Sequence, residues 1–202
     1  MAALSVLAIA WAIAVPDALP CTPNRTPFTC FSYVTVHWFI IIGSQSILGQ
    51  IPNPPPELKM SMEADMYPKN APEKADLIEG ALGEGSNFHD MNRYYAQGVG
   101  PETPTLPEGW QDRLHRVQTR VTDLKIGFCL DMLDLFMSKA YANREKDREF
   151  NMSLLQHGYV KLSDALDMVA RMPIEESDKR TMRLRIQRWA RMVQERGHDL
   201  PT

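Results

Sequence analysis

The run from Phe39 to Pro68 constrains the fold of this chain more than any other stretch of its 202 residues. It opens with four apolar residues, FIII. Gly43-Ser44 follows almost at once, which is typical of a buried strand that enters a close turn. Further on, in MSMEADMY, a period of two predicts a second strand with Glu63 and Asp65 on one face. The sequence therefore predicts a tight turn and two carboxylates directed at one point.

The acidic pair allows two explanations. Like charges so close raise each other's pKa unless a cation lies between them, and carboxylate oxygens suit a hard ion such as Mg²⁺. An alternating strand with one solvated face also shows Glu-x-Asp by chance, and for the pair alone this is the commoner case. The preceding Gly-Ser turn favours the metal site, because a close backbone turn can receive phosphate.

An apolar strand, Gly-Ser and an acidic pair on a second strand resemble the signature of the DNA polymerase β-like nucleotidyltransferase superfamily. The resemblance implies that Gly43, Ser44 and Gln45 bind a nucleoside triphosphate (NTP), and that Glu63 and Asp65 hold two Mg²⁺ ions. Eighteen residues separate Ser44 from Glu63, more than is usual in the superfamily, and they include the Pro-rich piece QIPNPPP. This piece is either a loop insertion at the mouth of the site or a sign that the turn and the pair do not converge.

A second group of candidate residues begins at Asp131, which we expect to cap a helix together with Asp134 in a variant of the capping box. The next helix carries the charge run REKDRE, and Gly158 ends it. Such a run is usually a solvated face whose ion pairs contribute about 0.3–0.5 kcal/mol each. The whole block LDMLDLFMSKAYANREKDREFNMSLL resembles the DL…K…R-x-KD block of the abortive-infection-type toxin nucleotidyltransferases and their uncharacterised bacterial relatives.

This second resemblance implies roles for four residues. Lys139 and Lys146 lie near the triphosphate, Arg144 supports the structure or the phosphates, and Asp147 belongs to the active site. Cations around the polyphosphate are what nucleotidyl transfer requires. The resemblance also implies a toxin-like role and an antitoxin protein as partner. Three acidic residues are open as the third carboxylate of the superfamily: Glu102, Asp131 and Asp147.

Other patterns complete an α+β fold, a mixed sheet of about five strands with flanking helices. We expect a helix from Ala71 to Gly83 and a loop up to Asp90, in which His89 is a polar turn residue or, with less support, a general base. From residue 131 to 202 the chain is predicted to be mainly helical, with Ser163 as a cap. The remaining strands are expected at Tyr94–Val99, Arg113–Val117 and Ile126–Leu130.

The long helix expected after Pro173 has an apolar stripe and a basic remainder. Residues 140–202 hold 12 basic and 10 acidic side chains, whereas residues 71–139 hold 7 and 11, within a net charge of −3. An anionic partner should therefore favour the second part. The basic side chains offer a surface to RNA, with tRNA implied by the toxin resemblance, or they form a solvated face. Those that lie largely off the stripe are Arg180, Arg183, Arg188 and Arg191.

Residues 1–32 differ in character from the domain predicted at 33–202, and we expect them not to be native to it. The first 15 residues are apolar, but they lack a basic start and a cleavage motif, and they are shorter than the roughly 20 residues that span a bilayer. Cys21 and Cys30 can pair only in an oxidising compartment, and three cysteines do not make a disulfide scaffold. We therefore expect a cytoplasmic protein without a membrane segment; a secreted or tethered protein is the alternative.

Together these patterns predict a Mg²⁺-dependent nucleotidyltransferase that moves a nucleotide from an NTP to an acceptor, with RNA favoured over a protein hydroxyl. The alternative is a non-catalytic relative that binds a nucleotide or a partner. The long interval between the Gly-Ser turn and the carboxylates supports this alternative.

Overall fold

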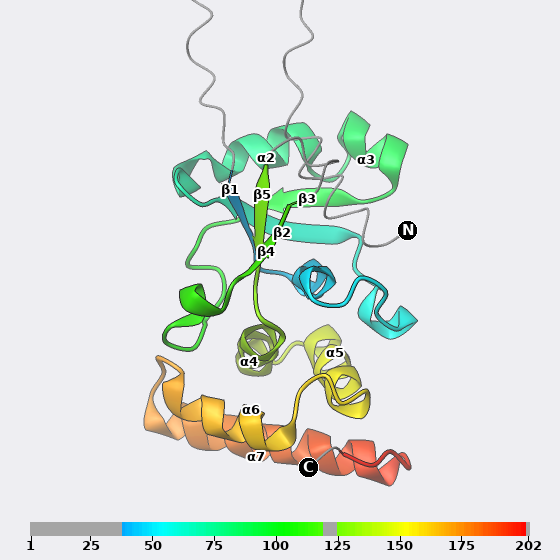
Figure 1. Ribbon diagram of the computed structural model, residues 1–202, viewed down its shortest axis with the longest axis vertical. Coiled ribbons are helices and arrows are strands. Elements are labelled where there is room, and N and C mark those ends of the chain that lie inside the picture. The colour runs from blue at the N-terminus through cyan, green and yellow to red at the C-terminus, as the bar shows by residue number, and fades with distance from the viewer. Residues whose placement is uncertain (1–37, 119–124, 201–202) are drawn as a thin grey trace, which may run out of the picture.

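The chain forms a mixed five-stranded sheet with helices on both sides of it (Figure 1). The structure is a computed structural model that describes residues 38–118 and 125–200. The order of strands across the sheet is β3-β2-β1-β5-β4. Their bounds are β1 Trp38–Ile41, β2 Glu63–Pro68, β3 Tyr95–Gly98, β4 His115–Val117 and β5 Ile126–Cys129.

The predicted apolar strand, β1, lies at the centre of this sheet. It pairs with β2 antiparallel and with β5 parallel, while β2 pairs with β3 parallel and β4 with β5 antiparallel. Phe39, Ile40 and Ile41 are each no more than 4% exposed, as expected for a strand with neighbours on both edges and cover on both faces. The α+β class with about five strands is confirmed.

Six α-helices accompany the sheet in the described part of the chain. They are α2 Ala75–Leu82, α3 Asn87–Asn92, α4 Met132–Ala142, α5 Glu145–Gln156, α6 Leu162–Met168 and α7 Glu176–Glu195. Short 3₁₀ turns fill the connections, at η1 Ser44–Gly49, η2 Pro56–Leu58, η3 Pro72–Lys74, η4 Trp110–Arg113 and η6 Val169–Arg171. The part after residue 131 is mainly helical, as predicted.

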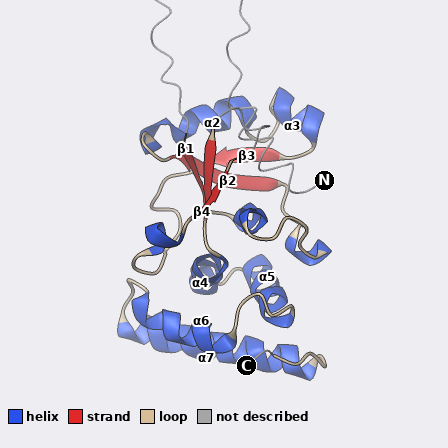
Figure 2. Cartoon of the chain, viewed as in Figure 1, coloured by secondary structure: helices blue, strands red, loops and turns tan. Residues whose placement is uncertain are grey.

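The helices are divided between the two sides of the sheet (Figure 2). α2 packs on β2 and β3, and α3 lies beside it. On the other side η1 contacts β2 and β5, α4 packs against η1, and α5, α6 and α7 pack onto α4. The predicted apolar stripe of α7 faces this assembly, since Met182, Ile186, Trp189 and Val193 are at most 2% exposed. α4 and α5 therefore lie between the sheet and α7 (Figure 1).

Two expectations about the middle of the chain were wrong. The loop predicted up to Asp90 contains α3, because Ser86 acts as its N-cap and accepts a hydrogen bond from the backbone N–H of His89. The fourth strand begins at His115 rather than Arg113, which belongs to η4. Arg113 is instead directed at Asp134, 2.7 Å away.

Two expectations about helix starts were also wrong, the capping box of α4 and the cap of α6. Asp131 does cap α4, accepting from the backbone N–H of Leu133 at 2.8 Å, but Asp134 completes no capping box because its carboxylate is fully buried against Arg113. α6 begins at Leu162, before Ser163, whose hydroxyl donates to Asp164. The sequence pattern assigned both side chains to hydrogen bonds with the helix backbone. Asp134 instead forms a buried ion pair with Arg113, and Ser163 instead donates to the carboxylate of Asp164.

The atypical segment 1–32, with Cys21 and Cys30, lies outside the described residues. Within them, no helix combines the length and the apolar character needed to cross a membrane. Cys129 is a buried free thiol in β5, and burial raises its pKa to about 12. A thiol with so high a pKa is not a nucleophile near neutral pH.

Candidate active site

The Gly-Ser turn and the acidic pair converge. β1 and β2 are antiparallel neighbours with Ile41 opposite Met66, and the N–H of Ile42 donates to the backbone oxygen of Asp65 at 3.0 Å. The 18-residue interval leaves the sheet as η1 and η2 and returns at the start of β2. The Pro-rich piece is thus a loop insertion, and Gly43 still lies beside Asp65. The long spacing therefore does not keep the turn and the acidic pair apart.

Gly43 is required by this close approach. A Cβ atom at position 43 would lie 1.9 Å from Oδ2 of Asp65, well inside van der Waals contact. Because the backbone of Gly43 has φ −83°, the glycine is needed for space and not for an unusual conformation. The turn therefore brings a bare backbone against a carboxylate.

Ser44 and Gln45 open η1 but have different surroundings. Ser44 faces the site, whereas the side-chain amide of Gln45 donates to the backbone oxygen of Ser61. Ser61 in turn exchanges hydrogen bonds with the backbone of Glu63 at 3.0 and 3.3 Å. Gln45 thus holds the segment that leads into β2, and its predicted contact with nucleotide stays a prediction.

Glu63 and Asp65 lie on one face of β2, as the period of two predicted. Both are partly buried, and no described cation donates a hydrogen bond to them, although the charges of Lys139 and Lys146 act on Asp65 from across the cavity. Burial, and after it the charge of Glu63, raises the pKa of Asp65 to about 6. Two close oxygen ligands whose charges repel fit a divalent cation, because the cation removes the repulsion.

Asp147 has the opposite environment. It is fully buried, with Lys139 Nζ 2.8 Å from Oδ1 and Arg144 Nε 2.6 Å from Oδ2. Burial alone would raise its pKa, but hydrogen bonds from Arg144 and Lys139 hold the pKa of Asp147 below its usual range. The charge run therefore contains one buried residue, and Asp147 is occupied by its two cations.

One cavity of about 450 Å³ gathers most of the predicted site residues. The Gly-Ser turn and the acidic pair line it from the sheet side, and Lys146 at the start of α5 lines it from the helical side. The predicted residues in its wall are Gly43, Ser44, Glu63, Asp65, Lys139, Arg144 and Lys146. Gln45 and Asp147 lie outside this wall.

The open candidates for a third carboxylate do not join the pair. Asp131 caps α4 and lies 2.9 Å from Nε2 of His115. Glu102 is exposed on the loop after β3, and it lines neither this cavity nor a second cavity that adjoins it. Among residues 38–118 and 125–200 no three acidic, histidine or cysteine side chains form a cluster suited to a metal.

Two further site residues lie on β3: the sequence favoured core or edge packing over base stacking for Tyr95, and it gave no sign of Gln97. The parallel register places Tyr95 opposite Glu63 and Gln97 opposite Asp65, so the same period of two brings them to the carboxylate face. Gln97 lines the cavity with Asp65. The alternation in the short run YAQG was visible, but the pairing of β3 with β2 was not, since it depends on the path of the chain through α2 and α3.

A family model described as "Nucleotidyltransferase of unknown function (DUF6036)" matches residues 32–196. The chain belongs to this nucleotidyltransferase family. No curated protein and no solved structure gave a significant match. Membership agrees with the superfamily resemblance carried by Gly43-Ser44 and by the acidic pair, while the likeness to toxins stays a prediction.

Proposed function

We propose that this protein is a Mg²⁺-dependent nucleotidyltransferase that moves a nucleotide from an NTP to an RNA acceptor. The observation that carries this proposal is one cavity in which a Gly-Ser turn, two carboxylates without a hydrogen-bonded cation, and Lys146 meet. Nucleotidyl transfer needs positive charge around a polyphosphate and carboxylates for metal at the reacting phosphorus. Family membership gives the same reaction class.

Glu63 and Asp65 would hold the metal, two ions by the superfamily resemblance. Bound Mg²⁺ supplies a Lewis acid that activates the attacking oxygen and neutralises the leaving pyrophosphate. Ser44 and Lys146 bind the triphosphate, and Gly43 lets it approach the backbone. Lys139 contributes positive charge to the cavity, and its ion pair with the buried Asp147 fixes the position of its ammonium group.

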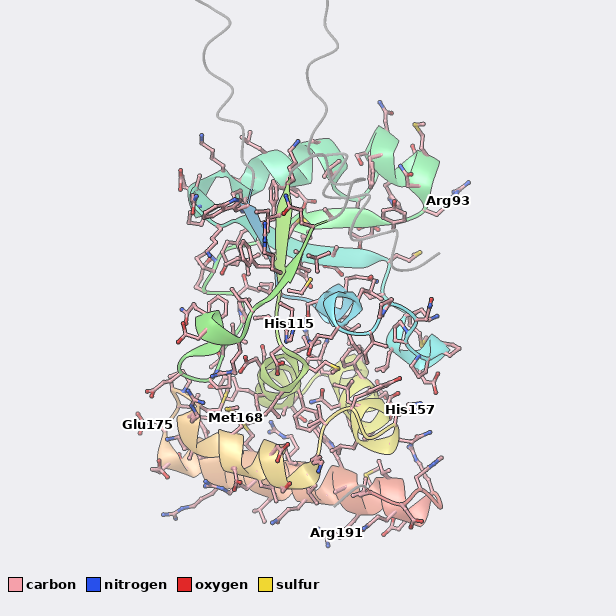
Figure 3. All side chains as sticks on the ribbon, in the orientation of Figure 1. Arg93, His115, His157, Met168, Glu175 and Arg191 are labelled. Atoms are coloured by element: carbon pink, nitrogen blue, oxygen red, sulfur yellow. The ribbon has the colours of Figure 1, made fainter. Side chains whose placement is uncertain are left out.

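The arginines of α7 support RNA as the acceptor. Arg180, Arg188 and Arg191 are exposed, Arg183 is partly exposed, and Arg191 points away from the body of the molecule (Figure 3). α4 and α5 separate α7 from the sheet, so a polyanion that reaches both the arginines and the cavity has to be large. A folded RNA such as tRNA fits this requirement, and the resemblance to the toxin branch adds a toxin-like role with an antitoxin partner to the proposal.

The deciding experiment incubates the protein with each labelled NTP, Mg²⁺ and either total RNA or cell protein. We expect label in RNA, lost when EDTA removes the metal. Label in protein alone would contradict the acceptor while keeping the chemistry. The matched control is Asp76→Asn, which removes an exposed carboxylate on α2 far from the cavity and should transfer label normally.

A non-catalytic nucleotide-binding protein is the second candidate. The observation that favours it is the lack of a third carboxylate beside Glu63 and Asp65 among the described residues. Such a protein would bind Mg²⁺-NTP, measured by calorimetry, but leave every fraction unlabelled. The two candidates therefore agree on binding and separate on transfer.

A further inference from the structure

A second cavity, of about 490 Å³, adjoins the first. The two cavities share wall residues at the start of β2 and at the two lysines, namely Ser44, Ser61, Glu63, Lys139 and Lys146. Glu63 therefore faces both spaces. A ligand whose charged part occupies the first cavity can extend past Glu63 into the second.

The second cavity has a different chemical character. Aromatic and thioether side chains stand in its wall beside the two shared lysines, namely Tyr95, Phe150, Met60 and Met62. Met60 is 81% exposed and Met62 58% exposed, so both thioethers are accessible to a ligand. Methionine adapts to flat or irregular ligands, and a tyrosine ring offers a face for stacking.

The wall that carries Tyr95 is held in place. The ring of His89 lies 4.9 Å from that of Tyr95, and Nδ1 of His89 accepts a hydrogen bond from the backbone of Gly85 at 3.0 Å. Phe88 packs edge-on against Tyr94, with ring centroids 5.4 Å apart. These contacts fasten α3 to β3, so His89 is a structural support of the cavity and Tyr95 does not have to be ordered by a ligand.

The opposite wall is fixed by α5 and η2. Lys139 Nζ lies 4.7 Å from the centre of the Phe150 ring, which anchors that ring between the two cavities. Nε2 of His157, at the end of α5 (Figure 3), lies 3.3 Å from Glu57 of η2. The two walls are thus held in place through α3, β3, α5 and η2 before any ligand binds.

We propose that this second cavity binds the nucleobase of the same NTP whose phosphates occupy the first. The inference rests on the proposed function, since it takes the triphosphate position from Ser44 and Lys146. With the reacting phosphorus beside Glu63, the nucleoside lies on one side of the carboxylates, and Tyr95 opposite Glu63 is the nearest aromatic face in register. A base can stack on Tyr95 and contact Met62.

Charge favours a neutral base over an RNA backbone in this space. Glu57, Glu84 and Glu149 lie in the wall together with Glu63, and this carboxylate-rich wall repels a chain of phosphates. A base carries no charge, and its N–H groups can donate to carboxylates. The arginines that suit RNA lie instead on α7.

The test compares a ligand that has a base with one that has none. Binding of each NTP and of inorganic tripolyphosphate, all with Mg²⁺, is measured by calorimetry on the full chain. We expect Tyr95→Ala to weaken binding of the preferred NTP roughly 5- to 150-fold, because a stacked base is lost, and to leave tripolyphosphate binding unchanged. Met62→Ala should weaken the NTP a few-fold, and it tests the same cavity from an exposed position if Tyr95→Ala folds poorly.

Three controls accompany these variants. Tyr95→Phe keeps the ring and should bind NTP as the wild type does. Tyr141→Ala and Met91→Ala remove the same side-chain types, 38% and 83% exposed, from positions outside both cavities, and should change nothing.

Three results would overturn the assignment. If Tyr95→Ala and Met62→Ala bind the NTP normally, the base lies elsewhere, and a higher KM for the acceptor in these variants would give the cavity to the acceptor's terminal base. If the wild type binds no tripolyphosphate, the phosphate cavity itself is refuted, and both the proposed function and the base subsite fall. If tripolyphosphate binds but adding a base to it gains no affinity, the base subsite alone fails.

Discussion

The two acidic groups beside the cavity have opposite surroundings. Glu63 and Asp65 repel each other with no described cation in hydrogen-bond contact, and burial with the charge of Glu63 raises the pKa of Asp65 to about 6 against the opposing charges of Lys139 and Lys146. Asp147 is more deeply buried, yet Lys139 and Arg144 neutralise it and lower its pKa. The carboxylates of Glu63 and Asp65 thus lack a cation in contact, whereas the carboxylate of Asp147 contacts two.

This difference separates the two kinds of role that a carboxylate can have. A balanced, buried ion pair fixes the position of its partners, here Lys139 and the start of α5. An unbalanced pair costs stability in the folded protein, and that cost is recovered when a cation binds. We therefore assign ligand binding to Glu63 and Asp65 and positioning to Asp147.

The largest expected effect is on transfer, in Glu63→Gln and Asp65→Asn. Each should lower the rate on the order of 10³-fold or more, because the metal loses a charged ligand. The same change in Asp65 should raise the free energy of unfolding of the metal-free protein at pH 7 by about 1–2 kcal/mol, because repulsion between partly buried carboxylates is removed. Initial rates and urea unfolding measure the two quantities.

An inactive variant that is also less stable than the wild type would contradict this interpretation, since it would show that Glu63 and Asp65 stabilise the fold. Full activity in both variants would remove the metal assignment altogether.

The next largest effect concerns stability, in Asp147→Asn. Loss of the charge leaves Lys139, 7% exposed, without its partner, and should lower the free energy of unfolding by about 3–5 kcal/mol at pH 7. Arg144→Ala removes a mostly exposed partner and should cost about 1 kcal/mol or less. Urea midpoints of the two variants separate these values.

The pH dependence follows from the lowered pKa of Asp147. A carboxylate with a depressed folded pKa stabilises the protein above its unfolded pKa, about 4, and this stabilisation is lost as the pH falls through the folded value. The gap between wild type and Asp147→Asn should be full at pH 7 and should narrow below about pH 4. A gap that stays constant down to pH 3 would mean that the charge of Asp147 is not what stabilises the fold.

The sequence predicted the acidic pair and the turn better than it predicted their neighbours. The strand pattern around Glu63 and the turn signal of Gly43-Ser44 are local, and local patterns are visible along the chain. The place of Gln97 depends on the parallel pairing of β3 with β2, which no pattern within four residues encodes. Non-local register is the information that was missing.

The charge run shows the same limit in another form. REKDRE has the composition of a solvated helix face, and most of it is exposed. Asp147 is the exception, because Lys139 from the preceding helix lies against it. Asp134 was likewise assigned to a local cap, but a partner 21 residues away took its carboxylate. In both cases an ion pair with a residue from a preceding element overrode local propensity.

A smaller effect distinguishes the two lysines of the site. Lys146 is exposed and lines both cavities, so Lys146→Ala should raise the KM for NTP about tenfold without changing stability, and Lys146→Glu should raise it further by repelling the triphosphate. Lys139→Ala should lower stability as well, because it unbalances Asp147. Steady-state kinetics with thermal unfolding test both; a stability loss in Lys146→Ala would return Lys146 to the structural group.

The smallest effects are expected on α7, where single arginines are solvated. Arg183, Arg188 and Arg191 changed to Ala should each weaken RNA binding a few-fold and reduce the slope of log affinity against log salt by about 0.7, as for one contact to a single-stranded phosphate. Arg185 is excluded because it donates to the backbone oxygen of Ala140 and so supports the end of α4. Arg116→Ala, an exposed arginine on β4, is the control and should leave the slope unchanged.

The triple variant should keep the wild-type affinity for Mg²⁺-NTP, because α4 and α5 separate α7 from the sheet. A triple variant that labels RNA as well as the wild type does, with the same salt slope, would leave α7 as a solvated packing helix and move the acceptor surface elsewhere.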